Sequence, residues 1–200
     1  HPVAPPYNGI DAMPDAIYKL KSAVRTLRAE SARFGYDPSK IGVLGFSRGS
    51  GMAGLLAATG TAADLEGDGL HPEQSSAIQA VLCQAGRFDH RTLLEDGFSP
   101  KKFDQYIAHF GDPILSADRW DAPSTVNWIT DKAPPFFLIV GGDDSYRVPQ
   151  LRKLHEALLA VGAKHPYIIE EGQSHQVTED PRNIAAIRTF FDRVLKGEDP

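Results

Sequence analysis

Apolar residues recur along this chain with two different spacings, which separates the predicted strands from the predicted helices. Four short apolar runs, at 40–46, 78–84, 136–140 and 166–170, indicate strands. Apolar residues spaced three or four apart indicate helices at about 14–34, 48–59, 148–161 and 181–195. In the first helix Ile17 and Val24 share one predicted face, and Lys21 and Arg25 share the other, so an amphipathic helix on the surface is expected.

The order of these elements predicts an α/β fold with a doubly wound, mostly parallel sheet and helices on both of its faces. A length of 200 residues with 42% hydrophobic content favours a single domain over 1–200. The segment 86–135 interrupts the alternation and is too long for a plain connection. It holds a predicted helix near 100–110 and aromatic residues that look exposed, including Phe98, Tyr106 and Trp120. We expect either an irregular cover over the sheet or a cap-like insertion that shapes a substrate pocket.

Composition narrows the classes of partner. A net charge of −5 with no basic run argues against a nucleic-acid partner, and no stretch of apolar residues is long enough to predict a membrane span. The single cysteine, Cys83, lies in an apolar run and is expected to be a buried structural residue. Residues 1–6 show no signal-peptide pattern, so the compartment, cytoplasmic or secreted, stays open.

Residues 45–49, Gly-Phe-Ser-Arg-Gly, directly follow the first predicted strand and precede a Gly- and Ala-rich helix. This strand-turn-helix context is typical of a nucleophile elbow, in which a sharp turn exposes the central serine and small flanking residues make room for the backbone. The motif predicts Ser47 as a nucleophile, with Gly45 and Gly49 providing the room. The backbone N–H of Arg48, at the start of the helix, is a candidate oxyanion donor.

A serine nucleophile needs a histidine base and a carboxylate that orients it. In a doubly wound sheet these groups gather where the strands end, and His175 follows the fourth predicted strand. The loop after the third strand contains Asp144, the candidate acid, and Asp143, the alternative, so the order Ser, Asp, His matches the one expected for this topology. No metal-binding motif accompanies these residues, and we expect neither a metal nor a cofactor.

Several of these segments together carry a family resemblance. The runs 41–50, 68–76, 133–142 and 171–175 resemble the α/β-hydrolase superfamily, in its carbohydrate-esterase-like branch of acetyl xylan and feruloyl esterases. The resemblance spans nearly the whole chain. It implies a serine esterase with Ser47 as nucleophile, His175 as base and an aspartate after the third visible strand as acid.

The chain departs from the family pattern at three places. It begins after the strands and the His-Gly-Gly type loop that provide half of the oxyanion hole in the family. Ser145 occupies the position at which the family carries its acid, and a shift to Asp144 would reverse the side-chain direction in an extended segment. Arg48 follows the nucleophile directly, where it could bind an acidic substrate group or pair with a nearby aspartate.

The late start also leaves the strand 40–46 with one unpaired side. We therefore expect a second copy of the chain, or another polypeptide, to pair with it.

These observations favour a serine hydrolase that cleaves a small ester, with an acylated carbohydrate as the candidate, through an acyl-enzyme at Ser47. Two alternatives stay open. A peptidase of the prolyl-oligopeptidase type is suggested by residues 145–149, Ser-Tyr-Arg-Val-Pro. A catalytically silent homologue that works as a binding or assembly module is suggested by the incomplete oxyanion hole and by Ser145.

Overall fold

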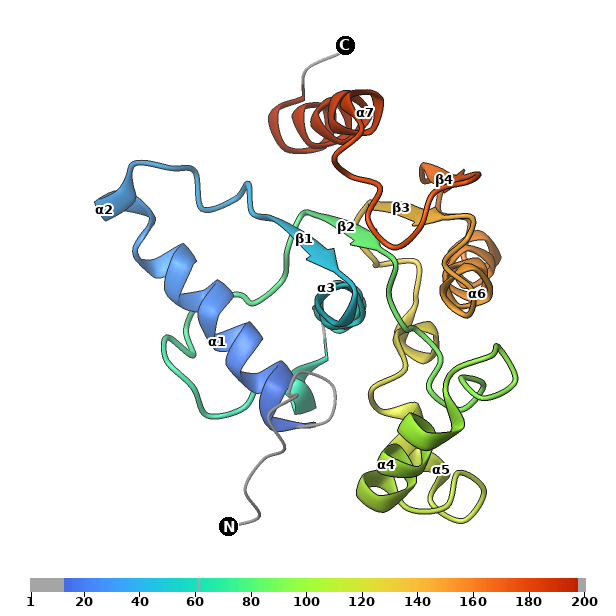
Figure 1. Ribbon diagram of the computed structural model, residues 1–200. Coiled ribbons are helices and arrows are strands. Elements are labelled where there is room, and N and C mark those ends of the chain that lie inside the picture. Colours follow the sequence, from blue (N-terminus) through green and yellow to red (C-terminus); the bar gives the residue numbers. More distant parts are fainter. Residues whose placement is uncertain (1–12, 61, 198–200) are drawn as a thin grey trace.

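Four parallel strands form one sheet in the computed structural model, which describes residues 13–60 and 62–197. The strands run in the order β1-β2-β3-β4 and are flanked by helices (Figure 1). They are β1 (Gly42–Phe46), β2 (Ala80–Gln84), β3 (Phe136–Gly141) and β4 (Tyr167–Glu170). The longer helices are α1 (Asp15–Ala29), α3 (Arg48–Ala58), α4 (Pro100–Phe110), α6 (Arg147–Ala160) and α7 (Pro181–Phe191). Shorter helical segments are α2 (Ser31–Phe34), α5 (Ala117–Asp121), the 3-10 turns η2 (Ala63–Leu65) and η3 (Thr125–Trp128), and the π-helical turn η4 (Asp192–Lys196).

The sheet is covered on both faces, which confirms the predicted α/β class. Successive strand residues point to opposite faces, so the fully buried β2 divides its side chains between two apolar clusters. Val81 and Cys83 belong to the cluster that includes residues of α1, α3 and α6, whereas Leu82 packs with Phe190 of α7. Figure 1 shows α7 and α3 on opposite sides of the sheet. Because the strands are parallel, their carboxyl ends lie side by side, with Phe46 paired with Gln84 and Gln84 paired with Ile139.

The predicted surface helix differs from the observed one in two respects. A break at Glu30 divides it into α1 and α2, and Lys21 and Arg25 are buried instead of solvent-facing, with 0% and 1% of their surface exposed. Both contact Glu66. Lys21 Nζ lies 3.0 Å from Glu66 Oε1, and Arg25 Nη1 lies 2.6 Å from Glu66 Oε2. Lys21 also donates to the carbonyl of Thr59 at 2.6 Å. The loop after α3 folds over α1, and helical periodicity cannot reveal a partner that lies more than 40 residues away.

The aromatic residues of the segment 86–135 were expected to be exposed, and this was wrong for most of them. Trp120 is 0% exposed, Phe98 5% and Tyr106 7%, because they pack against one another in a separate apolar cluster. Phe103, Phe110, Leu93 and Met52 of α3 also belong to this cluster. The segment therefore has a core of its own, and its action as a substrate cap stays a prediction.

Within the described part of the chain, β1 pairs with β2 alone and forms the edge of the sheet. Leu44 and Phe46 of this strand are 56% and 39% exposed. The predicted pairing with a second chain stays a prediction. Among the residues described, no helix combines the length and the apolar character that crossing a bilayer requires. The expectation for residues 1–6 lies outside the described residues.

Candidate active site

Ser47 stands between the last residue of β1 and the first residue of α3, with φ 56° and ψ −118°. A positive φ is uncommon for a residue with a side chain and persists only where the surroundings hold it. Here the N–H of Ser47 donates to the carbonyl of Gln84 at 2.9 Å, and the carbonyl of Ser47 accepts from the N–H of Ser50 at 3.1 Å. The strand-turn-helix geometry of the nucleophile elbow is thus confirmed.

The two glycines of the elbow play unequal parts. A Cβ on Gly45 would lie 2.5 Å from the carbonyl oxygen of Gly49 and 2.6 Å from the Cα of Ser50, both of which belong to backbone. A Cβ on Gly49 would have no neighbour within 4 Å. The sequence predicted that both glycines make space for the backbone, but only Gly45 is needed for the close approach of β1 and α3.

This difference predicts opposite outcomes for two alanine substitutions. Gly45→Ala is expected to lower the free energy of unfolding by about 3 kcal/mol, because the backbone must shift to accept the methyl group. Gly49→Ala is expected to be neutral or stabilising, since alanine favours a helix by up to about 1 kcal/mol over glycine. Urea denaturation of both variants measures the difference. Equal losses of stability in the two variants would contradict this description of the elbow.

The base and the acid predicted from the sequence meet at the carboxyl ends of β3 and β4. His175 Nδ1 lies 2.6 Å from Asp144 Oδ2, and the Asp144 side chain is 6% exposed. Asp143 is exposed, and its backbone N–H donates to the carbonyl of Gln173 at 2.9 Å. Of the two aspartates the structure therefore brings Asp144 to His175, as the sequence analysis preferred.

The sequence suggested that Asp144, one residue before Ser145, would point away from the site if the segment were extended. This expectation is wrong, because the chain turns at this point. The N–H of Asp144 donates to the carbonyl of Gly141 at 3.0 Å, and the N–H of Arg147 donates to the carbonyl of Asp144 at 2.9 Å. In such a turn, neighbouring side chains do not alternate as they do in a strand. Asp144 can thus face His175 from a position next to Ser145, which is exposed.

Three contacts fix the His175 loop against the strand ends. Gln84 Nε2 donates to the carbonyl of His175 at 3.2 Å, and the Phe46 ring packs on the His175 ring with centroids 4.7 Å apart. Gly141 allows the loop to approach, since a Cβ there would lie 1.8 Å from the carbonyl oxygen of Ser174. The sequence analysis did not single out Gln84, although a buried amide at a strand end beside the elbow was a usable signal. Because Asp144 engages Nδ1, the other nitrogen, Nε2, is left for a reacting group.

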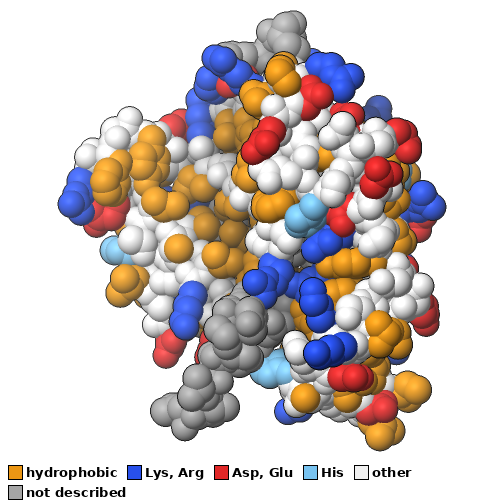
Figure 2. Space-filling view, viewed as in Figure 1, with side chains coloured by type: hydrophobic (Ala, Val, Ile, Leu, Met, Phe, Trp, Pro, Cys, Tyr) orange, Lys and Arg blue, Asp and Glu red, His pale blue; other side chains and the backbone are white. Residues whose placement is uncertain are grey.

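A cavity of about 860 Å³ opens beside Ser47. The residues that line it come from the elbow, the segment 86–135 and the start of α6. They are Ser47, Arg48, Arg87, Phe98, Lys102, Gln105, Tyr106, Ala108, His109, Tyr146 and Arg147. Figure 2 shows Lys and Arg side chains gathered in the depression at the centre of this face. Arg48, which was predicted from the sequence, is therefore joined by further cations that the sequence analysis did not identify.

Burial and the arginines govern the other titratable groups near the cavity. Burial raises the pKa of the Tyr146 hydroxyl, and the charges of Arg147, Arg87 and Arg48 oppose that shift. Burial and, second to it, the charge of Arg87 lower the pKa of His90 to about 3. His90 is 0% exposed and stays neutral near physiological pH.

Neither a thiol nucleophile nor a metal site is found among the described residues. Burial raises the pKa of the Cys83 thiol to about 12, so it is not a nucleophile at neutral pH. Within 13–60 and 62–197 no cluster of three or more histidine, cysteine or acidic side chains is arranged to hold a metal ion.

Known proteins resemble this chain in sequence. The BD-FAE family model matches residues 7–158. A protein named probable carboxylic ester hydrolase LipM, from Mycobacterium tuberculosis, is 28% identical in an alignment of 170 residues, and the match covers 79% of this chain and 36% of that protein. The chain thus spans about a third of this curated relative.

Two solved structures superpose on most of the chain. A bifunctional GH43-CE protein of Bacteroides eggerthii is 28% identical with a TM-score of 0.82, covering 94% of this chain and 26% of its own. A truncated carbohydrate esterase from gut microbiota is 23% identical with a TM-score of 0.83, covering 94% of this chain and 72% of its own. These likenesses agree with the α/β-hydrolase fold.

Proposed function

Because the chain belongs to the BD-FAE family, we propose that it is a serine esterase that cleaves a small carboxylic ester through an acyl-enzyme at Ser47. The observation that supports this most directly is the 2.6 Å contact between His175 and the buried Asp144. This contact lies at the carboxyl end of the sheet, where the strained Ser47 also lies. An acylated carbohydrate is the candidate substrate, as the sequence resemblance implies.

In the proposed reaction Ser47 Oγ attacks the ester carbonyl while His175 Nε2 takes the hydroxyl proton. Asp144 holds His175 in the required tautomer and stabilises the imidazolium that forms. The imidazolium then gives its proton to the leaving alkoxide, which departs as the alcohol and leaves Ser47 acylated. A water molecule, deprotonated by the same histidine, then attacks the acyl carbonyl. The bond from the acyl carbon to Ser47 Oγ breaks, the imidazolium returns its proton to Oγ, and the acid is released.

The negative oxygen of the tetrahedral intermediate needs hydrogen-bond donors. The N–H of Arg48 is at the first position of α3, where the helix dipole favours negative charge. Loss of one such donor typically costs about 3 kcal/mol of transition-state stabilisation.

Hydrolysis of p-nitrophenyl acetate by the chain tests this proposal. We expect saturable release of p-nitrophenol above the buffer rate, and complete inhibition by a fluorophosphonate, which phosphonylates activated serines. A protein that neither hydrolyses the ester nor reacts with the probe would contradict the proposal. It would support the catalytically silent homologue instead. None of the three relatives above is named as a peptidase, so the peptidase alternative gains no support from them.

A further inference from the structure

The described residues that line the cavity beside Ser47 carry an excess of positive charge, although the chain has a net charge of −5. Four of its lining residues are lysine or arginine, and none of the described lining residues is acidic: the four are Arg48, Arg87, Lys102 and Arg147. Asp144 compensates Arg147, with 2.9 Å between Arg147 Nη1 and Asp144 Oδ1. Among the described lining residues, Arg87 and Lys102 therefore keep a positive charge without a carboxylate partner, in a protein whose overall charge is negative.

Arg87 is the most informative of these cations, because it is 7% exposed and its described partners are neutral. Its Nη1 donates to the Tyr106 hydroxyl, and its guanidinium carbon lies 5.7 Å from the Phe98 ring centroid and 5.4 Å from that of Tyr106. Burying a guanidinium without a carboxylate partner is unfavourable for stability. Charges kept in this way near a reactive group are typical of a binding site.

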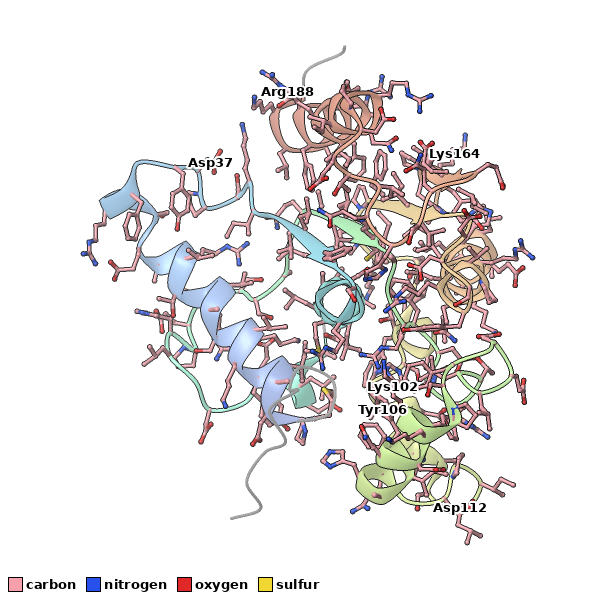
Figure 3. All side chains as sticks on the ribbon, in the orientation of Figure 1. Asp37, Lys102, Tyr106, Asp112, Lys164 and Arg188 are labelled. Carbon is pink, nitrogen blue, oxygen red and sulfur yellow. The ribbon has the colours of Figure 1, made fainter. Side chains whose placement is uncertain are left out.

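Lys102 adds to this surplus from another element, and Arg147 offers a further hydrogen-bond donor. Lys102 lies on α4, is exposed, and forms no salt bridge within the described part of the chain. Figure 3 shows Lys102 and Tyr106 together on α4, at its end nearest to α3. Arg147 pairs with Asp144 through Nη1, whereas its buried Nε has no hydrogen-bond partner among the described residues.

We infer that this cavity binds esters of acidic molecules, and that a carboxylate on the substrate is held by Arg87 and Lys102 while the ester carbonyl lies at Ser47. The inference rests on the proposed function and specifies its substrate class. An arginine presents paired N–H donors that match the two oxygens of a carboxylate. The aromatic rings of Phe98, Tyr106 and Tyr146 in the same cavity suit a ring-shaped body such as a pyranose, so an acylated uronic acid fits both features.

The test compares acidic and neutral esters of similar size. We expect kcat/KM for p-nitrophenyl hemisuccinate to exceed that for p-nitrophenyl butyrate by about tenfold at low ionic strength, and the ratio to fall as salt screens the charges. A second comparison measures the release of acetate from acetylated oligogalacturonate, an acidic sugar, and from acetylated xylo-oligosaccharide, a neutral one. A preference in this pair places the substrate's carboxylate on the sugar, whereas a preference in the first pair alone places it on the acyl group. A ratio at or below one in both pairs, from a protein that does cleave the neutral ester, overturns the inference and leaves the proposed function standing.

Two neighbouring lysines of α4 provide a matched pair of variants. Lys102→Gln is expected to reduce the acidic-to-neutral ratio by about fivefold. Lys101→Gln, an equally exposed residue of the same helix that does not line the cavity, is expected to leave it unchanged. If these cations instead stabilise the oxyanion, Lys102→Gln would slow acidic and neutral esters equally, which overturns the inference.

A binding measurement keeps the inference testable in a protein without activity. Calorimetry on Ser47→Ala protein is expected to detect trigalacturonate and to give at least about tenfold weaker binding for neutral xylotriose. Equal affinity for the two sugars, or binding of neither, overturns the inference regardless of the outcome for hydrolysis.

Discussion

Ser47→Ala is expected to lower kcat for p-nitrophenyl acetate by about 10⁵-fold, since loss of the nucleophile in a serine hydrolase removes nearly all of the triad's contribution. The residual rate would reflect binding and oxyanion stabilisation alone. The elbow backbone is held by contacts of the N–H and the carbonyl of Ser47, so removal of Oγ leaves the fold intact. Steady-state kinetics, with the unfolding transition measured alongside, checks this expectation.

Ser145→Ala provides the control. Ser145 is an exposed serine in the loop that carries Asp144. We expect this variant to keep the rate of the parent chain. Should Ser145→Ala lower kcat as strongly as Ser47→Ala, the assignment of both positions would be wrong.

Asp144→Asn is expected to lower kcat by about 10⁴-fold with little change in KM, because an amide cannot hold His175 in the tautomer that leaves Nε2 free to accept a proton. The matched variant Asp143→Asn should keep its activity, since Asp143 is exposed and contacts the loop of His175 only through its backbone N–H. Kinetics of the two variants with one ester makes the comparison.

Asp144 also pairs with Arg147, so a structural effect must be separated from a chemical one. Thermal unfolding of Asp144→Asn and of Arg147→Gln serves this purpose. If Arg147→Gln loses as much stability as Asp144→Asn but keeps far more activity, the loss of rate belongs to the contact with His175. If Asp143→Asn is the inactive variant, Asp144 is not the acid.

The sequence alone was sufficient to predict the sheet, the elbow and the loops at the strand ends. Strand runs such as 78–84 are continuously apolar because β2 is buried on both faces, and this signal is local. The topology then brings the carboxyl ends of parallel strands together, so the sequence alone was sufficient to assign Ser47 and His175 to the same end of the sheet.

Features that depend on contacts between distant segments could not be predicted in this way. Lys21 and Arg25 were assigned to the surface because their partner, Glu66, lies in a loop that periodicity does not describe. The aromatic cluster and the cationic cavity are likewise assembled from separate segments, with Arg87 after β2 and Lys102 on α4. Asp144 was doubted only because a turn was treated as an extended segment.

The position of a fluorophosphonate adduct tests the central claim most directly. Trypsin cleaves after Lys40 and Arg48, and the resulting peptide, 41–48, contains Ser47 as its single hydroxyl residue. Mass spectrometry of the labelled parent chain is expected to find one phosphonyl group for each chain, on this peptide. An adduct on any other peptide, or an unlabelled chain, would contradict the assignment of Ser47 as the activated nucleophile.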